Sequence, residues 1–246
     1  ETLSLPSWTL KLGKFKAALG RHNTFHTHAF PFIDAPLINE QLLGEEGLND
    51  VGFSAAALLP APWFLELTLQ ALAGDSDSLF ASPSPYDLAA VAQVKNLWDL
   101  TDDATLELNL FSTAGNSPAA HRSNVYGADA TYKWRPSVGG KYKALIITGQ
   151  YLNGLKVDSR AAGIAAWTQY QFAERWWAQA RYDRTHGEGA NTPSTHRESA
   201  LFGFFPSEFS GFRLQYSRLS EPDKATDHTI AFQWIISMGA HPAHAY

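Results

Sequence analysis

The sequence contains no cysteine, so it has no CxxC site; such an absence occurs in cytosolic enzymes and also suits a protein exposed to an oxidising periplasm. No apolar run approaches the roughly 18 residues of a transmembrane helix, so no such helix is expected. Positive charge is not in excess, since the formal net charge is −5, and this argues against a nucleic-acid partner. No charged segment followed by an apolar one opens the chain, and we expect any signal peptide to have been removed already.

Aromatic residues, by contrast, are abundant. They make up 13% of the chain, with 8 Trp and 9 Tyr, which is high for a soluble domain of this size. An aromatic belt at a membrane interface requires this content. The slightly negative mean hydropathy does not oppose a membrane location, because strands of a membrane barrel alternate lipid-facing and lumen-facing residues.

The dominant hydrophobic period is two, which predicts β-strands. Between residues 105 and 111, for example, Leu106, Leu108 and Leu110 fall on one face and Glu107 and Asn109 on the other. Twelve segments follow this pattern, at 8–19, 51–60, 62–72, 88–100, 104–113, 121–135, 141–153, 160–172, 175–186, 196–206, 210–219 and 226–240. Most hold roughly ten residues, which is enough for a tilted strand to cross a bilayer. In the segment 141–153 either Leu145 and Ile147 or Ala144 and Ile146 face outward.

The connections between these segments alternate between short and long. The long ones are 20–50, 73–87, 114–120, 154–159, 187–195 and 220–225. Bacterial outer-membrane barrels have this asymmetry, with short periplasmic turns and long extracellular loops. The sequence therefore predicts an all-β fold: a transmembrane antiparallel up-and-down β-barrel of about 12 strands, forming a single domain over residues 1–246. The first loop is long for a connector without structure of its own, and we expect residues 20–50 to fold partly into the barrel mouth.

Tryptophans gather near the short turns. Trp8, Trp63, Trp98, Trp134 and Trp176 all lie within a few residues of a short turn or of the amino-terminal entry. In a barrel they would form a ring at the level of the periplasmic headgroups; the alternative interpretation is five scattered core tryptophans.

The polar face of the strands would line the interior. We expect ten charged residues there, five of each sign: Lys11, Glu66, Lys95, Glu107, Asp129, Lys133, Arg181, Asp183, Arg213 and Asp227. Two interpretations are open, since these residues either line a thin water-filled path or pair with one another and close it. The balance of charge indicates no strong preference between anions and cations.

The stretch from Leu10 to Arg21 (LKLGKFKAALGR) resembles the K-x-G-[KQ]-F-[KR]-x-x-[FL]-G strand of Gram-negative porin-like proteins, including the phosphate-selective type. Residues 45–52 are similar to the loop-to-strand return of the same group, and residues 237–246 to the ends of its porin-like and receptor-like members. The resemblance implies an outer-membrane barrel and passive transport, and a final aromatic resembles the signal read by the barrel assembly machinery. The lysine-rich ladder of the phosphate-selective type is not evident in this sequence. Family members tend to have further strands upstream, so we expect this chain to be a fragment of a longer protein or its barrel to have more strands in the parent.

Two other functions are weighed against a channel. His22, His26 and His28 lie in the first long loop near Asp34, Glu40, Glu45 and Glu46, a spacing that suits capture of Zn²⁺ or Cu²⁺; the alternative is that they are solvated loop histidines. A barrel hydrolase would pair Ser123 with His121 or Ser199 with His196. Neither pair lies in a G-x-S-x-G turn, and no third orienting group is evident.

These observations together predict a channel of the Gram-negative outer membrane, crossing it many times, that lets small solutes or ions diffuse through a narrow lumen. We expect no enzymatic activity and no resident cofactor apart from the metal alternative. The expected partners are the lipid bilayer, small polar solutes or ions, the barrel assembly machinery during biogenesis and, by analogy with porins, further copies of the chain.

Overall fold

The computed structural model describes residues 7–76, 79–81, 84, 86–117, 122–140, 142–156, 159–187, 193–207 and 209–236. It is built on twelve long strands: β1 (Trp8–Lys16), β2 (Asn49–Leu58), β3 (Phe64–Leu72), β6 (Ala89–Thr101), β7 (Ala104–Asn116), β8 (Arg122–Trp134), β9 (Ala144–Lys156), β10 (Ser159–Ala173), β11 (Trp176–Gly187), β12 (Ser194–Ser207), β13 (Ser210–Ser220) and β14 (Asp227–Ile236). A two-residue hairpin, β4 (Asp75–Ser76) with β5 (Phe80–Ala81), lies in the second long connection and was not predicted. Three short helices lie between β1 and β2: α1 (Gly20–Asn23), η1 (Thr27–Ala29) and α2 (Leu37–Leu43).

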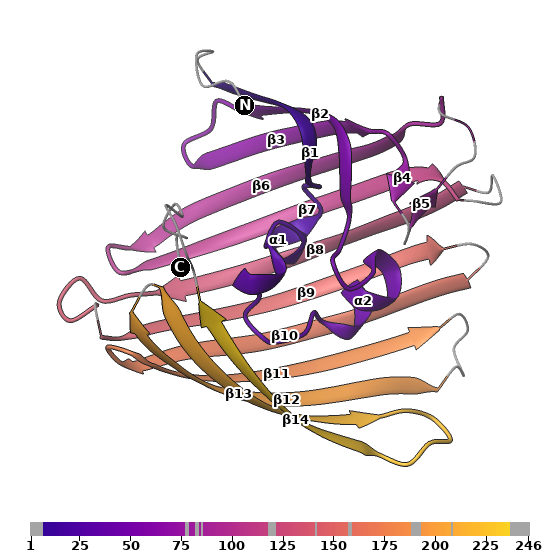
Figure 1. Ribbon diagram of the computed structural model, residues 1–246. Coiled ribbons are helices and arrows are strands. Elements are labelled where there is room, and N and C mark those ends of the chain that lie inside the picture. The colour runs from indigo at the N-terminus through magenta and orange to yellow at the C-terminus, as the bar shows by residue number, and fades with distance from the viewer. Residues whose placement is uncertain are drawn as a thin grey trace.

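The twelve strands form one antiparallel sheet in which each strand pairs with the next along the chain, in the order β1-β2-β3-β6-β7-β8-β9-β10-β11-β12-β13-β14. The predicted all-β class, the strand count and the up-and-down order are confirmed. The sheet is strongly curved, and its hollow side carries α1 and α2 (Figure 1). Among the described residues, β1 and β14 form the two outer edges and do not pair with each other. No described helix is long and apolar enough to cross a membrane.

The polarity of the two faces of the sheet is the reverse of that in a soluble protein, because the polar side chains are buried and the apolar ones are exposed. On the hollow side the strands bury polar side chains, among them Asn109, Thr131 and Asp183, each at most 2% exposed. On the outer side they expose large apolar ones, including Leu110, Phe202 and Leu214, each between 46% and 52% exposed. An exposed apolar band of this breadth is not stable in water but is the normal outer surface of a membrane barrel. The ambiguity in β9 is resolved, because Ile147 is exposed on the outer side. Ala144 and Ile146 are buried on the hollow side, on the same face as Thr148 and Gln150.

An aromatic row crosses the outer face near the short turns. Trp176 lies next to Phe204 with ring centroids 4.3 Å apart, Phe204 stacks with Phe212 at 6.5 Å, and Phe212 stacks with Trp234 at 5.9 Å. Further along the same outer face, beside β3 and β6, Trp63 approaches Trp98 at 6.2 Å. Of the five predicted belt tryptophans, Trp63, Trp98, Trp134 and Trp176 occur within three residues of a strand end beside a short turn, and Trp8 begins β1 at the amino-terminal entry. Membrane barrels place their aromatic belts at such strand ends.

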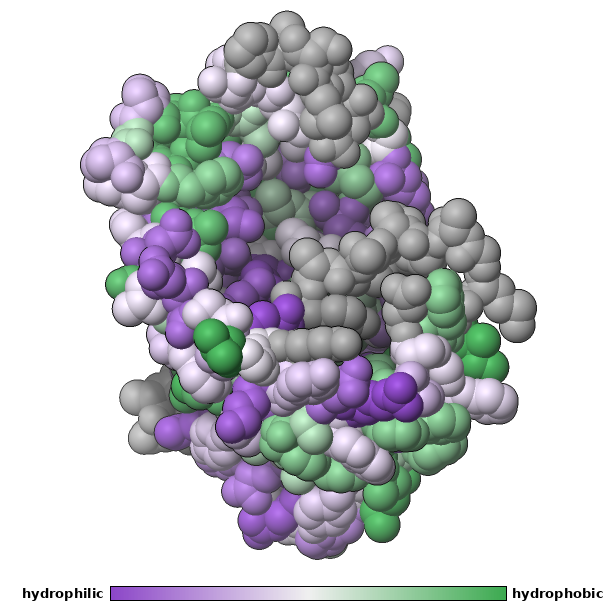
Figure 2. Space-filling view, turned by 90° about the vertical axis from the view of Figure 1, so that its left-hand side faces the viewer, coloured by the Kyte–Doolittle hydropathy of each residue, from purple (hydrophilic) through white to green (hydrophobic). Residues whose placement is uncertain are grey.

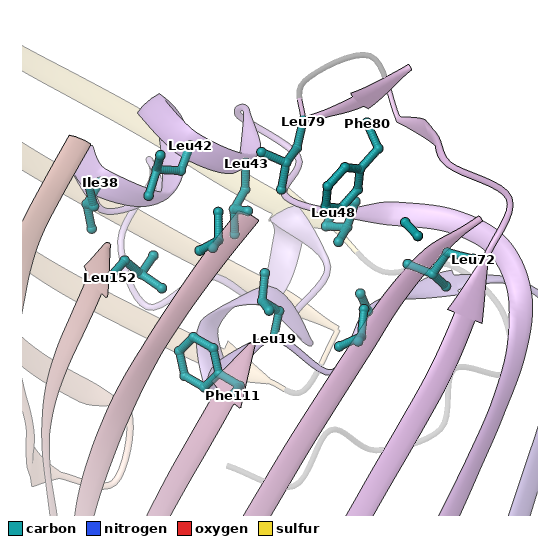
Figure 3. Packing of buried hydrophobic residues seen from close by; sticks show 14 of the residues in the cluster. Leu19, Ile38, Leu42, Leu43, Leu48, Leu72, Leu79, Phe80, Phe111 and Leu152 are labelled. Carbon is teal, nitrogen blue, oxygen red and sulfur yellow. The ribbon is translucent and has the colours of Figure 1, made fainter. Parts of the chain in front are cut away.

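The segment between β1 and β2, residues 17–48, lies on the hollow side; we call it the inner segment. The helix α1 contacts β7 and β8, and α2 contacts β9, β10 and β11. Apolar side chains of the segment, such as Leu19, Ile38 and Leu42, pack against Phe111 and Leu152 of the sheet (Figure 3). This contact is a small hydrophobic core inside an otherwise polar interior, and it positions the inner segment across the space that the strands surround.

Candidate functional site

The candidate site is the polar interior of the curved sheet. Because paired residues of neighbouring antiparallel strands point to the same face, the register places whole rows of side chains inside. One row runs Lys95, Asn109, Asp129, Gln150, Ala165, Asp183 and Arg197. The next row runs Glu107, Thr131, Thr148, Trp167, Arg181, Ser199 and Ser217. The interior is therefore rich in charged groups, hydroxyls and amides.

The inner segment is tied to this wall by arginine. Asp34 accepts a bond from Arg181 Nη2 at 2.9 Å and forms an ion pair with Arg197 Nη1 at 2.7 Å. Both guanidinium groups also face Asp183, at 2.8 Å from Arg181 and 3.3 Å from Arg197. Glu40 of α2 completes the group at 3.4 Å from Arg197. These two cations and three anions form one network, which satisfies the requirement that buried charges be paired.

Backbone carbonyls of the inner segment add to this attachment. Arg213 donates from Nη2 to the carbonyl oxygens of Phe30 and Pro31 at 2.8 and 2.7 Å. Arg197 likewise donates to the carbonyl of Ala35. Gln215 accepts from the Ile33 amide at 2.8 Å, so β12 and β13 both hold the same stretch of backbone.

A second charged group lies on the opposite part of the wall. Arg21 of α1 lies 3.4 Å from Glu107, and Lys95 lies 3.3 Å from the same carboxylate. Asp129 accepts from the Arg21 amide at 2.8 Å and from Asn109 at 2.7 Å. The inner segment is thus attached at two places, through Arg21 near its start and through Asp34 in its middle.

Burial changes the pKa values of the inner segment. Burial, together with nearby Arg181 and Lys16, lowers the pKa of His22 to about 3, so this imidazole is neutral. Burial alone would raise the pKa of Asp34, but Arg181 and Arg197 hold it below its ordinary value. Burial raises the pKa of Glu40 despite the neighbouring Arg197.

The ten predicted interior charges occupy different environments. Glu107, Asp129, Arg181, Asp183 and Arg213 are buried on the hollow side, while Lys95, Lys133 and Glu66 are partly exposed there. Lys11 and Asp227 lie exposed on the edge strands β1 and β14. The buried charges bond mainly to the inner segment and to neighbouring strands.

Four members of the charge networks were not among the predicted interior charges: Arg197, Arg21, Asp34 and Glu40. The sequence could have predicted the inward position of Arg197, since Arg197 lies on the same face of β12 as Ser199 and Leu201. Arg21 and Asp34 are loop residues, and no period in the sequence assigns a face to a loop.

Space remains on both sides of the inner segment. At the short-turn end a recess of about 760 Å³ is lined by residues that include Asp99, Asp103, Lys133 and Arg135. Figure 2 views this end and shows hydrophilic residues gathered in its hollow. At the long-loop end a second recess of about 440 Å³ lies between α2 and the ends of β11 and β12.

The structure does not bring the three loop histidines together. His22 is buried among aromatic rings, 4.5 Å from Phe30 and 6.2 Å from Trp167, whereas His26 and His28 stack on each other at 5.7 Å. Within the described ranges, no group of three His, Cys, Asp or Glu residues is arranged to hold a metal ion.

The hydrolase alternative is not assembled either. Ser199 points inward and bonds Ser217 at 3.0 Å, while His196 points outward and bonds the Tyr182 hydroxyl at 2.9 Å. The two residues lie on opposite faces of β12, so this candidate pair is wrong. The other pair includes His121, which lies outside the described residues.

Comparisons with known proteins give two kinds of match. No family model matches the chain. A protein of Aquifex aeolicus (strain VF5), described as uncharacterised, is 25% identical over an alignment of 293 residues that covers 100% of this chain and 62% of the relative. Two solved structures of KdgM porin, one of them in complex with disordered oligogalacturonate, match with a TM-score of 0.36 at 8–9% identity, covering 77% of this chain and 94% of theirs. The fold class stated above stands on the strand order of the chain itself.

Proposed function

We propose that this chain forms a channel in the outer membrane of a Gram-negative bacterium, through which small polar solutes or ions diffuse passively. The observation that carries the proposal is the reversed distribution of side chains: polar and charged ones are buried inside the sheet, and aliphatic and aromatic ones are exposed outside. Hydrocarbon is the environment that accepts such an outer face. The aromatic row beside the short turns supports the same location.

The inner segment sets the width of the proposed channel. A recess opens on each side of it, and its charges are neutralised by wall residues. Solutes would pass along the parts of the wall that line these two recesses, which include Lys133 and Arg135 at the short-turn end and Thr185 and Thr195 at the long-loop end. The nearly equal numbers of acidic and basic groups favour weak discrimination between anions and cations.

Bilayer recording tests the proposal directly. Purified chain inserted into planar lipid bilayers is expected to give discrete current steps in salt solution, with a small ratio between anion and cation permeability. Deletion of residues 24–44 removes Asp34, η1 and α2, and it is expected to increase the size of the steps severalfold. A protein that inserts but never conducts would overturn the channel, and equal conductance after the deletion would overturn the role of the inner segment.

A further inference from the structure

We propose that the inner wall near the short turns carries a binding site for a neutral, hydroxyl-rich solute, that is, a saccharide, on an aromatic pair formed by Trp177 and Phe205. This deepens the proposed function and rests on it, because both rings must face solution rather than lipid. Aromatic side chains in the outer row meet lipid, but these two point to the opposite face and need another explanation.

The register places Trp177 inside. Trp177 pairs with Gln171 on one side and with Gly203 on the other, and Gly203 in turn pairs with Arg213. Gln171, Gly203 and Arg213 are all buried on the hollow side, while the adjacent Trp176 lies in the outer aromatic row. Trp177 is only partly buried, so part of the indole remains available.

Phe205 lies on the same face through the ordinary alternation of β12. Leu201, Gly203 and Phe205 point inward, whereas Phe202 and Phe204 point outward. Two glycines make room for its ring. A Cβ on Gly203 would lie 2.9 Å from Phe205 Cε2 and 3.7 Å from Trp177 Cβ, and a Cβ on Gly211 would lie 2.6 Å from Phe205 Cδ1.

Amides adjoin this aromatic pair. Gln179 lies two residues after Trp177 on the same face of β11, and Gln169 of β10 is directly opposite Gln179. Gln179 is 8% exposed, and its Oε1 has no hydrogen-bond partner among the described residues. An amide offers both a donor and an acceptor, as a sugar hydroxyl does, so the two groups match without any charge.

The neighbouring charges favour a neutral ligand. Arg213 is already bonded to the carbonyls of Phe30 and Pro31 and, at 3.1 Å, to Gln233. The recess at this end contains both signs of charge, with three aspartates against Lys133 and Arg135. An uncharged sugar suits this site, because the aromatic rings can stack on it and the amides can bond its hydroxyls. The site also has no excess of positive charge that would favour an anion.

The chain supplies its own matched controls, because each inward ring has an outward neighbour. Binding of a linear neutral gluco-oligosaccharide of six units is measured by calorimetry in detergent micelles and by blockade of the bilayer current. Trp177→Ala and Phe205→Ala are each expected to weaken binding about tenfold, as loss of a stacking ring does. Trp176→Ala and Phe204→Ala are expected to leave it unchanged. Trp177→Phe retains a ring and is expected to keep most of the affinity for the oligosaccharide. Gln179→Leu is expected to lower this affinity severalfold.

The two readouts separate this site from the channel itself. Current in salt without any response to the oligosaccharide overturns the site and leaves the channel standing. Calorimetric binding that depends on Trp177, in a protein that carries no current, supports the site and overturns the channel. Equal affinity in Trp177→Ala and Trp176→Ala, or tighter binding of a six-unit uronic-acid oligomer than of the neutral one, overturns the proposal.

Discussion

Asp34 and Arg181 are 147 residues apart in sequence, yet the carboxylate and the guanidinium meet at 2.9 Å inside the sheet. The same carboxylate also reaches Arg197, so one side chain of the inner segment holds two strands of the wall.

Replacement of Asp34 by Asn is therefore expected to destabilise the folded chain by about 3 kcal/mol, because it leaves two nearly buried guanidinium groups short of negative charge. The matched control is Glu198→Gln, which breaks an exposed ion pair with Arg218 on the outer face. That control is expected to cost less than about 1 kcal/mol. Unfolding by denaturant in detergent measures both; similar losses in the two variants would contradict the anchoring role of Asp34.

The neutral, buried His22 predicts a dependence of stability on pH. Its pKa falls from 6.5 to about 3 on folding, so the unfolded chain binds the proton more readily and stability decreases as the pH drops from 6.5 towards 3. Between pH 6.5 and 4.5 the expected loss is about 1–3 kcal/mol. Asp34, whose pKa is lowered by Arg181 and Arg197, adds a further loss at the acid end. Melting temperatures measured at several pH values test this effect. His22→Phe is expected to flatten the dependence of melting temperature on pH above pH 4.5. The same pH dependence in this variant and in the original chain would contradict a neutral His22.

Gly20 begins α1 at a close approach to the wall. Its φ is +76°, and a Cβ there would lie 2.6 Å from both Asp129 Oδ2 and Phe111 Cε1. Gly20→Ala is expected to cost about 2 kcal/mol or more, from backbone strain and overpacking together. Gly149→Ala on β9 serves as the control, since nothing lies within 4 Å of its Cβ position. Melting temperatures of the two variants in detergent provide the test. Equal values would contradict the prediction, because they would show that the inner segment can move away from the wall without loss of stability.

The absence of cysteine allows each face of the sheet to be labelled selectively. Single-cysteine variants at Lys133, in the short-turn recess, and at Leu110, on the outer face, are reconstituted into liposomes. A charged maleimide is expected to modify the first at least tenfold faster, because hydrocarbon excludes the reagent from the second. Detergent denaturation should make the two rates equal. Fast labelling of the Leu110 variant in intact liposomes would contradict the outward position of that face.

Much of the sheet was predictable because a period of two assigns every strand residue to a face. All twelve strands occur near their predicted positions, and Glu107 and Asn109 face inward as their alternation requires. The first strand ends at Lys16 rather than at residue 19, because Ala17 and Leu19 turn into the hydrophobic core of the inner segment. The contacts of that segment were beyond prediction, since loop residues such as Asp34 find partners by tertiary packing and not by any local pattern. The inward position of Phe205, by contrast, follows from the two-residue period, because Phe205 continues the face of Leu201 and Gly203 on β12.

The unpaired edges of the sheet have a consequence for how the chain enters a membrane. Within the described residues, the backbone amides and carbonyls on the free sides of β1 and β14 have no strand partner. Water can satisfy these groups, but hydrocarbon cannot, and each unsatisfied group then costs several kcal/mol. In the proposed membrane location, insertion of the chain and covering of these two edges are therefore expected to occur together. Because the sheet has an even number of strands in simple succession, β1 and β14 run in opposite directions. Each edge strand could therefore form an antiparallel ladder of hydrogen bonds with the other.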